Sequence, residues 1–261
     1  MRDLFMLYRE AFDETRHSLR RAWMGIVAIY VYALGLRLVT GVAVVVPQPF
    51  LAGLLIGLAD ALAVGALLAL LQRAVARQTL KLPDLREALG AYFWNVIAVG
   101  FVLWIPFMLL GQVASPPLFA AVSLLAAVFL NPLPEVIYQA RTASPLEDLA
   151  ESARFVQQQW IEWFLPIVLV AAPVASVVLF ASDTAVAFRG GLSFGSFLAL
   201  PALLVLRLTE LLGVPITARP MVMEIATPVL AFVVLLFRGH LFASLYGTSR
   251  RQRAFRRRVA R

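Results

Sequence analysis

The chain has 261 residues, of which 61% are hydrophobic and only 15% are charged. Soluble domains carry about 25% charged residues, so this composition excludes a water-soluble globular protein and indicates an integral membrane protein. The net charge of +8 at pH 7 comes from arginines beside apolar segments. That pattern is typical of membrane orientation, and we expect no nucleic-acid binding.

The absence of cysteine excludes disulfide bonds, and the two histidines, His17 and His240, are too few for a typical zinc centre. We therefore expect no metal and no cofactor. The segment Gly-Leu-Ser-Phe-Gly at 191–195 matches a nucleophile-elbow pattern, but Ser193 is predicted to lie far from His240. The sequence thus predicts a non-enzymatic protein without catalytic residues.

Residues 1–21 are predicted to form an amphipathic helix that precedes the first membrane span. The segment lacks the apolar run and cleavage site of a signal peptide, so we expect it to stay in the mature protein. Its larger apolar residues share one helical face with Trp23: Leu4, Tyr8, Phe12 and Leu19. We expect the helix to lie in the membrane interface, with docking of a partner protein as the alternative.

Residues 22–247 are predicted to form an all-α transmembrane domain of six helices, followed by a basic tail at 248–261. About 20 apolar residues are needed to cross a bilayer. Six runs meet this requirement: 22–46, 50–71, 91–110, 118–138, 160–180 and 222–246.

Most of the 23 Lys and Arg residues lie on one side of these spans. The positive-inside rule therefore predicts that both termini lie in the cytoplasm and that the protein resides in a bacterial inner membrane. The basic tail is expected to bind anionic lipids. The apolar segment 197–214 would move the tail outside if it crossed, so we predict an interfacial or re-entrant helix with Arg207 paired to Glu210. A seventh span is the alternative.

Two predicted cytoplasmic connections, 82–104 and 144–170, share the order proline, Asp-Leu-x-Glu, aromatic residues and span. Each is predicted to form a short surface helix that turns into the next span. In the second connection, Ser144 is predicted to cap the helix and Glu147 to complete a capping box. Internal duplication and independent occurrence are both open explanations.

A charged N-terminal helix, six spans, the helix SPLEDLAESARFVQQQW and a last span ending LFASLYG follow one another. In this order the chain resembles a group of bacterial six-span membrane proteins of mostly unknown function. The group includes the membrane domain attached to some glycerophosphodiester phosphodiesterases. The resemblance implies a membrane domain without a hydrolytic site of its own. Its motifs are patterns of spacing rather than catalytic signatures, so it supplies no site residues. The phosphodiesterase activity is not expected, because the sequence contains no soluble barrel of the kind that carries it.

Asp60 is the one charged residue within the apolar stretch 53–71. Small residues recur every four positions on the same helix and predict a seam for close helix packing: Gly53, Gly57, Ala61 and Gly65. A lone carboxylate within the bilayer costs about 3 kcal/mol or more, so we expect Asp60 to be paired or protonated. Its depth matches Arg238 best, and Arg37 is the second candidate.

Further polar candidates lie near the cytoplasmic ends of the last three spans: Asn131, Glu135, Glu162 and His240. Pro132 and Pro134 each lack a backbone donor and are expected to break the fourth span. Broken helices with acidic neighbours form ion or substrate sites in transporters. The simpler interpretation is that the prolines shape packing while the acids face cytoplasmic arginines.

The sequence therefore favours a non-enzymatic integral membrane subunit that acts as a scaffold or assembly partner. Its partner in the membrane would be another protein or a second copy of the chain. The alternative is a small transporter or permease with a polar site around Asp60 and Glu135. A packed bundle with an uncovered apolar flank favours the first function, and a wet polar cavity favours the second.

Overall fold

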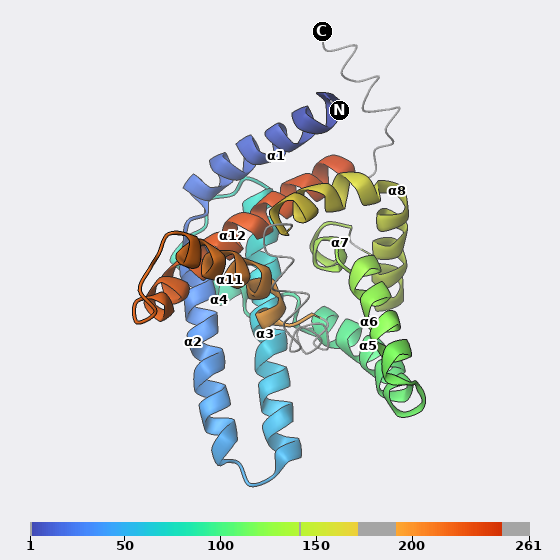
Figure 1. Ribbon diagram of the computed structural model, residues 1–261. Coiled ribbons are helices and arrows are strands. Elements are labelled where there is room, and N and C mark those ends of the chain that lie inside the picture. The colour runs from blue at the N-terminus through green and yellow to red at the C-terminus, as the bar shows by residue number, and fades with distance from the viewer. Residues whose placement is uncertain (1, 141, 172–191, 247–261) are drawn as a thin grey trace.

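The structure, a computed structural model, describes residues 2–140, 142–171 and 192–246 (Figure 1). The helices in these ranges are α1 (Arg2–Arg21), α2 (Met24–Val45), α3 (Pro49–Val75), α4 (Leu82–Ala88), α5 (Phe93–Val113), α6 (Pro116–Phe129), α7 (Leu133–Gln139), α8 (Pro145–Ala171), α11 (Phe194–Leu211) and α12 (Arg219–Leu245). The helices up to α8, and α11 and α12, follow one another with short connections.

Six helical segments among the described residues are long and apolar enough to cross a membrane. They are α2, α3, α5, the α6–α7 segment, α11 and α12. The protein is therefore an all-α integral membrane protein with six candidate spans, which confirms the predicted fold class.

The fifth predicted span and the segment after it need separate description. Residues 160–171 of the predicted span 160–180 form the last part of α8, and 172–180 lie outside the described residues, as does the tail 248–261. The segment predicted to be interfacial or re-entrant forms α11, which has the length and composition of a span. Its 18 residues extend about 27 Å, slightly less than the ~30 Å hydrocarbon core of a bilayer.

Two helical hairpins extend from the core in different directions (Figure 1). α2 and α3 run side by side to a tight turn at residues 46–48, and α5 and α6 form a second hairpin to one side. α1 lies across the end of the molecule opposite the α2–α3 turn. We call these two ends the α1 end and the turn end.

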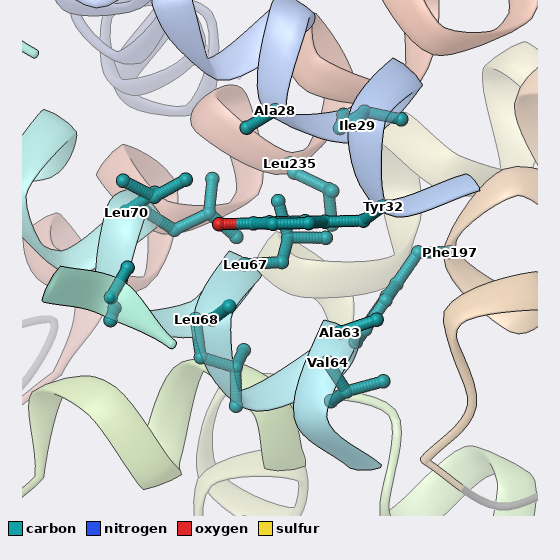
Figure 2. Packing of buried hydrophobic residues seen from close by; sticks show 14 of the residues in the cluster. Ala28, Ile29, Tyr32, Ala63, Val64, Leu67, Leu68, Leu70, Phe197 and Leu235 are labelled. Atoms are coloured by element: carbon teal, nitrogen blue, oxygen red, sulfur yellow. The ribbon is translucent and has the colours of Figure 1, made fainter. Parts of the chain in front are cut away.

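The core surrounds the half of α3 that lies toward the α1 end. Figure 2 shows the Tyr32 ring of α2 beside Leu67 of α3, with Phe197 of α11 and Leu235 of α12 in the same cluster, and all four side chains are buried. Lipid tails are as apolar as leucine, so close packing rather than exclusion of water holds helices together in a membrane. This packing needs small residues: a Cβ at Gly25 would lie 2.2 Å from the ring of Phe232.

The predicted small-residue seam on α3 packs over only half of its length. Ala61 is buried, and a Cβ at Gly65 would lie 2.9 Å from the backbone nitrogen of Phe93 in α5. Gly53 and Gly57 are exposed, and a Cβ on either would meet no described atom within 4 Å. The seam therefore joins α3 to α5 near the α1 end and is open near the turn end.

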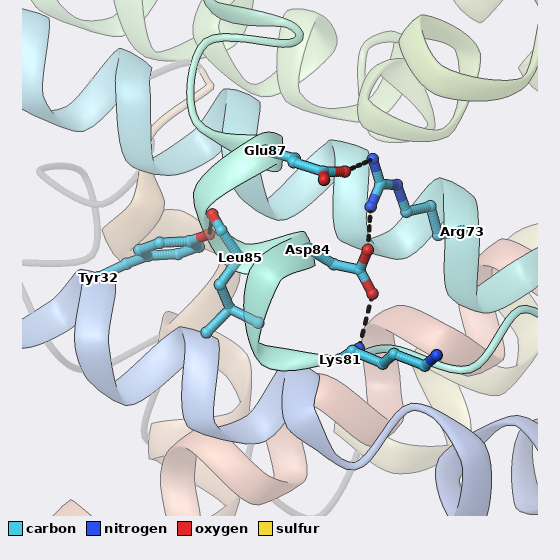
Figure 3. Close-up of polar contacts among 6 residues, drawn as sticks. All are labelled: Tyr32, Arg73, Lys81, Asp84, Leu85 and Glu87. Atoms are coloured by element: carbon cyan, nitrogen blue, oxygen red, sulfur yellow. Dashed lines mark hydrogen bonds and ion pairs between the residues drawn. The ribbon is translucent and has the colours of Figure 1, made fainter.

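The short helix α4 is fixed to α3 and α2 by polar contacts (Figure 3). Arg73 of α3 donates to Asp84 at 2.6 Å and to Glu87 at 3.2 Å, and Asp84 also accepts from the backbone nitrogen of Lys81 at 2.6 Å. Tyr32 of α2 donates to a backbone carbonyl of α4 at 3.2 Å. One arginine thus neutralises two carboxylates of the first predicted surface helix.

The second predicted surface helix is the first part of α8. The Ser144 hydroxyl accepts from the backbone nitrogen of Glu147 at 3.3 Å, and the Glu147 carboxylate accepts from the nitrogen of Ala143 at 2.9 Å. The predicted cap is therefore present. Gln159 has non-helical dihedral angles, so α8 bends at the junction predicted between surface helix and span.

Substitution of the two ends of the seam should have opposite effects. We expect Gly65→Ala to destabilise the protein by about 1–3 kcal/mol, because its methyl group would overlap the α5 backbone. Gly57→Ala, the matched control, should leave stability unchanged or raise it by up to about 1 kcal/mol, because alanine favours helix at an open site. Unfolding of both variants by SDS titration in mixed micelles measures the difference. Equal losses would mean that the α3–α5 contact is absent.

Candidate functional site

A buried ion pair joins α12 to α7 within the candidate spans. Arg238 donates to both carboxylate oxygens of Glu135, from Nε at 2.8 Å and from Nη2 at 3.0 Å. The Glu135 side chain is 2% exposed and that of Arg238 is 18% exposed. Such a two-point contact is the strong geometry for a guanidinium and a carboxylate, and it leaves neither charge unpaired in an apolar setting.

The break between α6 and α7 provides a backbone carbonyl that makes a third hydrogen bond with Arg238. Pro132 and Pro134 cannot donate backbone hydrogen bonds, so α6 ends at Phe129 and α7 begins at Leu133. The carbonyl of Asn131, which faces this break, accepts from Arg238 Nη2 at 2.7 Å. The predicted break is thus confirmed, and the arginine uses a carbonyl next to it.

Trp163 of α8 completes the cluster. Its indole nitrogen donates to the side-chain oxygen of Asn131 at 2.9 Å. The Arg238 guanidinium lies 5.2 Å from the centre of the Trp163 ring, within cation–π range. The structure therefore brings three predicted residues, Asn131, Glu135 and Arg238, together and adds Trp163. Trp163 was not among the predicted site residues, although its position after the surface helix placed it at the same depth.

The other two candidates of this region, Glu162 and His240, lie beside the cluster and face α1. His240 follows Arg238 by two positions, or about 200° around the helix, and its Nε2 lies 2.9 Å from the hydroxyl of Ser18. Tyr8 donates to the backbone carbonyl of Glu162 at 3.0 Å. Burial and the Glu162 charge raise the pKa of Tyr8 to about 12, so its hydroxyl stays a donor at neutral pH. Both contacts fasten α1 to the bundle.

Asp60 has a different partner from the one predicted. Its Oδ1 accepts from the backbone nitrogen of Phe194, the first residue of α11, at 3.0 Å. The expected pairing with Arg238 is wrong, because Arg238 points to α7. The carboxylate instead lies at the positive end of the α11 dipole, where anions are stabilised.

The contact of Asp60 also sets the depth of α11. Asp60 lies about 16 Å along α3 from Pro49, so α11 begins near the middle of the bundle rather than at one of its faces. This start is favourable to the predicted re-entrant placement, which stays a prediction. Ser193, the serine of the elbow-like motif, accepts from the backbone nitrogen of Ser196 and serves as the N-cap of α11.

Arg37, the second candidate for Asp60, pairs with Glu224 of α12. Next to this pair, Tyr30 donates to the backbone carbonyl of Ile225. The two charged side chains are 68% and 57% exposed. The sequence analysis did not predict Glu224 as the partner of Arg37, because Glu224 lies in the first turns of another predicted span, far from Arg37 in the sequence.

The pair predicted within 197–214 is confirmed. Arg207 donates to Glu210 at 2.5 Å, and Arg219 at the start of α12 lies 3.8 Å from the same carboxylate. This contact was predictable because both residues are on one helix at a spacing that brings side chains together.

Comparison of the chain with protein-family models, with curated proteins and with solved structures finds no match. Function is therefore inferred from the polar contacts that join the helices. Asp60, Glu135 and Arg37 each have a partner within the chain, and the pairs link helices that are far apart in sequence. Such contacts fix helix positions, and only the Arg37–Glu224 pair, of these three contacts, is open to the surroundings of the molecule.

Removal of one member of the buried pair should cost far more than removal of both. We expect Arg238→Met to destabilise the protein by about 3–5 kcal/mol, because Glu135 would be buried without a counter-charge. Combining it with Glu135→Met should restore most of the loss, because the double variant buries no charge. SDS titration of the two variants gives the comparison. Additive losses would show that the pair does not act as a unit.

Two substitutions of Asp60 distinguish a cap from a charge pair. An asparagine at this position would keep an oxygen that accepts from the Phe194 nitrogen but would lose the charge at the positive end of the α11 dipole, so Asp60→Asn should cost only about 0.3–1 kcal/mol. Asp60→Leu removes the acceptor and should cost about 1–2 kcal/mol. The same titration measures both. A large loss in Asp60→Asn would indicate that the negative charge itself has a partner.

Proposed function

We propose that the protein is a non-enzymatic integral membrane subunit whose α2 face around Arg37 packs against a partner in the bilayer. The observation that carries this proposal is the exposure of the Arg37–Glu224 pair within two candidate spans. The resemblance to bacterial six-span membrane proteins accords with this role.

The depth of Arg37 makes its exposure informative. Arg37 is eight residues from the end of α2 at Val45, or about 12 Å from that end along the helix. Charged side chains at such depth face protein or water rather than lipid, because contact with hydrocarbon is costly. Among the described residues only Glu224 neutralises Arg37, and it leaves more than half of each side chain uncovered. A partner with polar groups at this depth would cover the pair.

The surface next to Arg37 suits close helix packing. Gly41 lies one helical turn beyond Arg37 on the same side of α2. It is exposed, and a Cβ there would meet no described atom within 4 Å. Leu34 and Val45, both exposed, border it. A small residue between apolar neighbours lets a second helix approach the backbone, as in small-xxx-small contacts.

A transporter is the second candidate, and the broken helix at Glu135 favours it. Transporters place acidic residues beside unwound helix segments near the bilayer centre. The bidentate contact with Arg238, however, occupies both oxygens of Glu135. An ion or substrate would have to displace the guanidinium, so this contact supports a structural role for Glu135.

The experiment is extraction of the tagged protein into polymer-bounded native nanodiscs, followed by mass measurement and identification of all polypeptides. We expect the wild-type chain of 28.7 kDa to be recovered with a second copy or another protein in fixed ratio. Gly41→Leu should release the partner, because its side chain blocks the approach of a helix.

Gly35→Leu is the matched control, because Gly35 lies on the same helix about 160° from Arg37 and is also free of described atoms within 4 Å of a Cβ. It should retain the partner. Recovery of the wild-type chain alone, as a single copy, would overturn the proposal. Retention of the partner by Gly41→Leu would place the interface on another face.

A further inference from the structure

α1 is fixed to the bundle by a face of small side chains. Its buried residues are Leu7, Ala11, Thr15 and Ser18, and Ala22 directly after the helix is buried as well. This face packs mainly against α12 (Figure 1), and the Ser18–His240 contact lies within it. Glu14 also pairs with Arg77 at the end of α3, at 2.5 Å. The orientation of α1 about its own axis is thereby set.

This orientation exposes aromatic side chains on one side of α1. Phe5 and Phe12 lie within about 20° of one another at 100° per residue, and both are more than half exposed. Trp23, which is also more than half exposed, lies after the end of α1 at Arg21 and directly before α2. Phe5 and Phe12 border the buried face, which contains none of these rings, although the sequence pattern had placed Phe12 and Trp23 on the apolar side of the helix.

Arginines follow Phe5 and Phe12 on their outer side. Arg16, Arg9 and Arg20 lie about 20°, 40° and 60° further around the helix than Phe5, and all three are exposed. Arg9 has a loose contact with Asp13 at 4.0 Å. Among the described residues, Arg16 and Arg20 have no carboxylate within ion-pair distance. Going around the axis of α1, the buried face is therefore followed first by the aromatic side chains and then by the arginines.

We define the aromatic–arginine stripe as Phe5, Phe12, Arg9, Arg16 and Arg20 of α1 together with Trp23 after the helix. We propose that this stripe binds anionic phospholipid headgroups of the adjacent leaflet. α1 leads directly into α2, a candidate span that begins at Met24, so Trp23 lies where the chain enters the bilayer. Aromatic rings prefer the headgroup level, and guanidinium groups bind phosphates through two parallel hydrogen bonds. The stripe places the aromatic rings next to the bundle and the arginines further from it. This order suits a lipid headgroup layer, in which the rings lie among the headgroups and the guanidinium groups reach the phosphates.

The test compares lipid affinity in the full-length protein. Purified protein in mild detergent is titrated with fluorescent phosphatidylglycerol and, separately, with fluorescent phosphatidylcholine. Each arginine near an anionic surface contributes about 1 kcal/mol, so Arg16→Gln combined with Arg20→Gln should weaken phosphatidylglycerol binding by about 10-fold or more. Binding of phosphatidylcholine should stay unchanged. Both side chains are exposed, so the variant should fold normally.

The matched control removes two exposed arginines outside the stripe, by Arg21→Gln combined with Arg86→Gln, and should change phosphatidylglycerol affinity by less than about 3-fold. Arg21 lies about 160° around α1 from Phe5, and Arg86 belongs to α4. Phe5→Ala combined with Phe12→Ala should weaken the binding of both lipids. Equal effects of the two pairs of arginine variants would show that net charge alone attracts the lipid and would overturn the proposal. Competition by millimolar inorganic phosphate would also overturn it, because it would indicate a small-anion site.

Discussion

The contact of Arg238 with Glu135 and the Asn131 carbonyl is the constraint on which the α1 end depends. Two charges in an apolar bundle are tolerated only when they neutralise each other and when their remaining hydrogen-bonding groups are used. The proline break supplies a carbonyl that an unbroken helix would keep for itself. Arg238 takes it, and α12 is thereby held to α7 at a fixed depth. Trp163 covers the guanidinium and ties α8 to the same point.

The surroundings of the glycines differ between the two ends of the molecule. Toward the α1 end, glycines lie against rings and backbone: Gly25 against Phe232, Gly65 against α5, and Gly239 against Tyr138. Toward the turn end, α2 and α3 continue with exposed leucine and valine, and Gly53 and Gly57 lie in open space. Because apolar side chains gain little by leaving lipid for one another, the splayed hairpins need no compaction to persist. The bundle is held at one end and open at the other.

Features that depend on neighbours along the chain were predictable from the sequence. The extents of the first four predicted spans and of the last, the Ser144 cap, the bend before residue 160 and the Arg207–Glu210 pair all follow from local spacing. The partners of Asp60 and Arg238 did not follow. The prediction compared depths along single helices, and depth is one coordinate, whereas contact requires that two side chains also point toward each other. Asp60 meets a backbone nitrogen of α11, which no count of charged residues reveals.

The two charged surfaces of the molecule place different demands on its surroundings. The arginines of α1 are at the point where the chain enters the bilayer, so headgroups and water alone are sufficient to solvate them. Arg37 and Glu224 are further along their helices, with glycine and aliphatic residues around them. An ion pair there is stable in hydrocarbon only if other polar groups or water reach it. Lipid is therefore sufficient for the proposed contacts of the α1 end, while the proposed partner helix would have to lie along the half of α2 toward the turn end to bring polar groups to the Arg37–Glu224 pair.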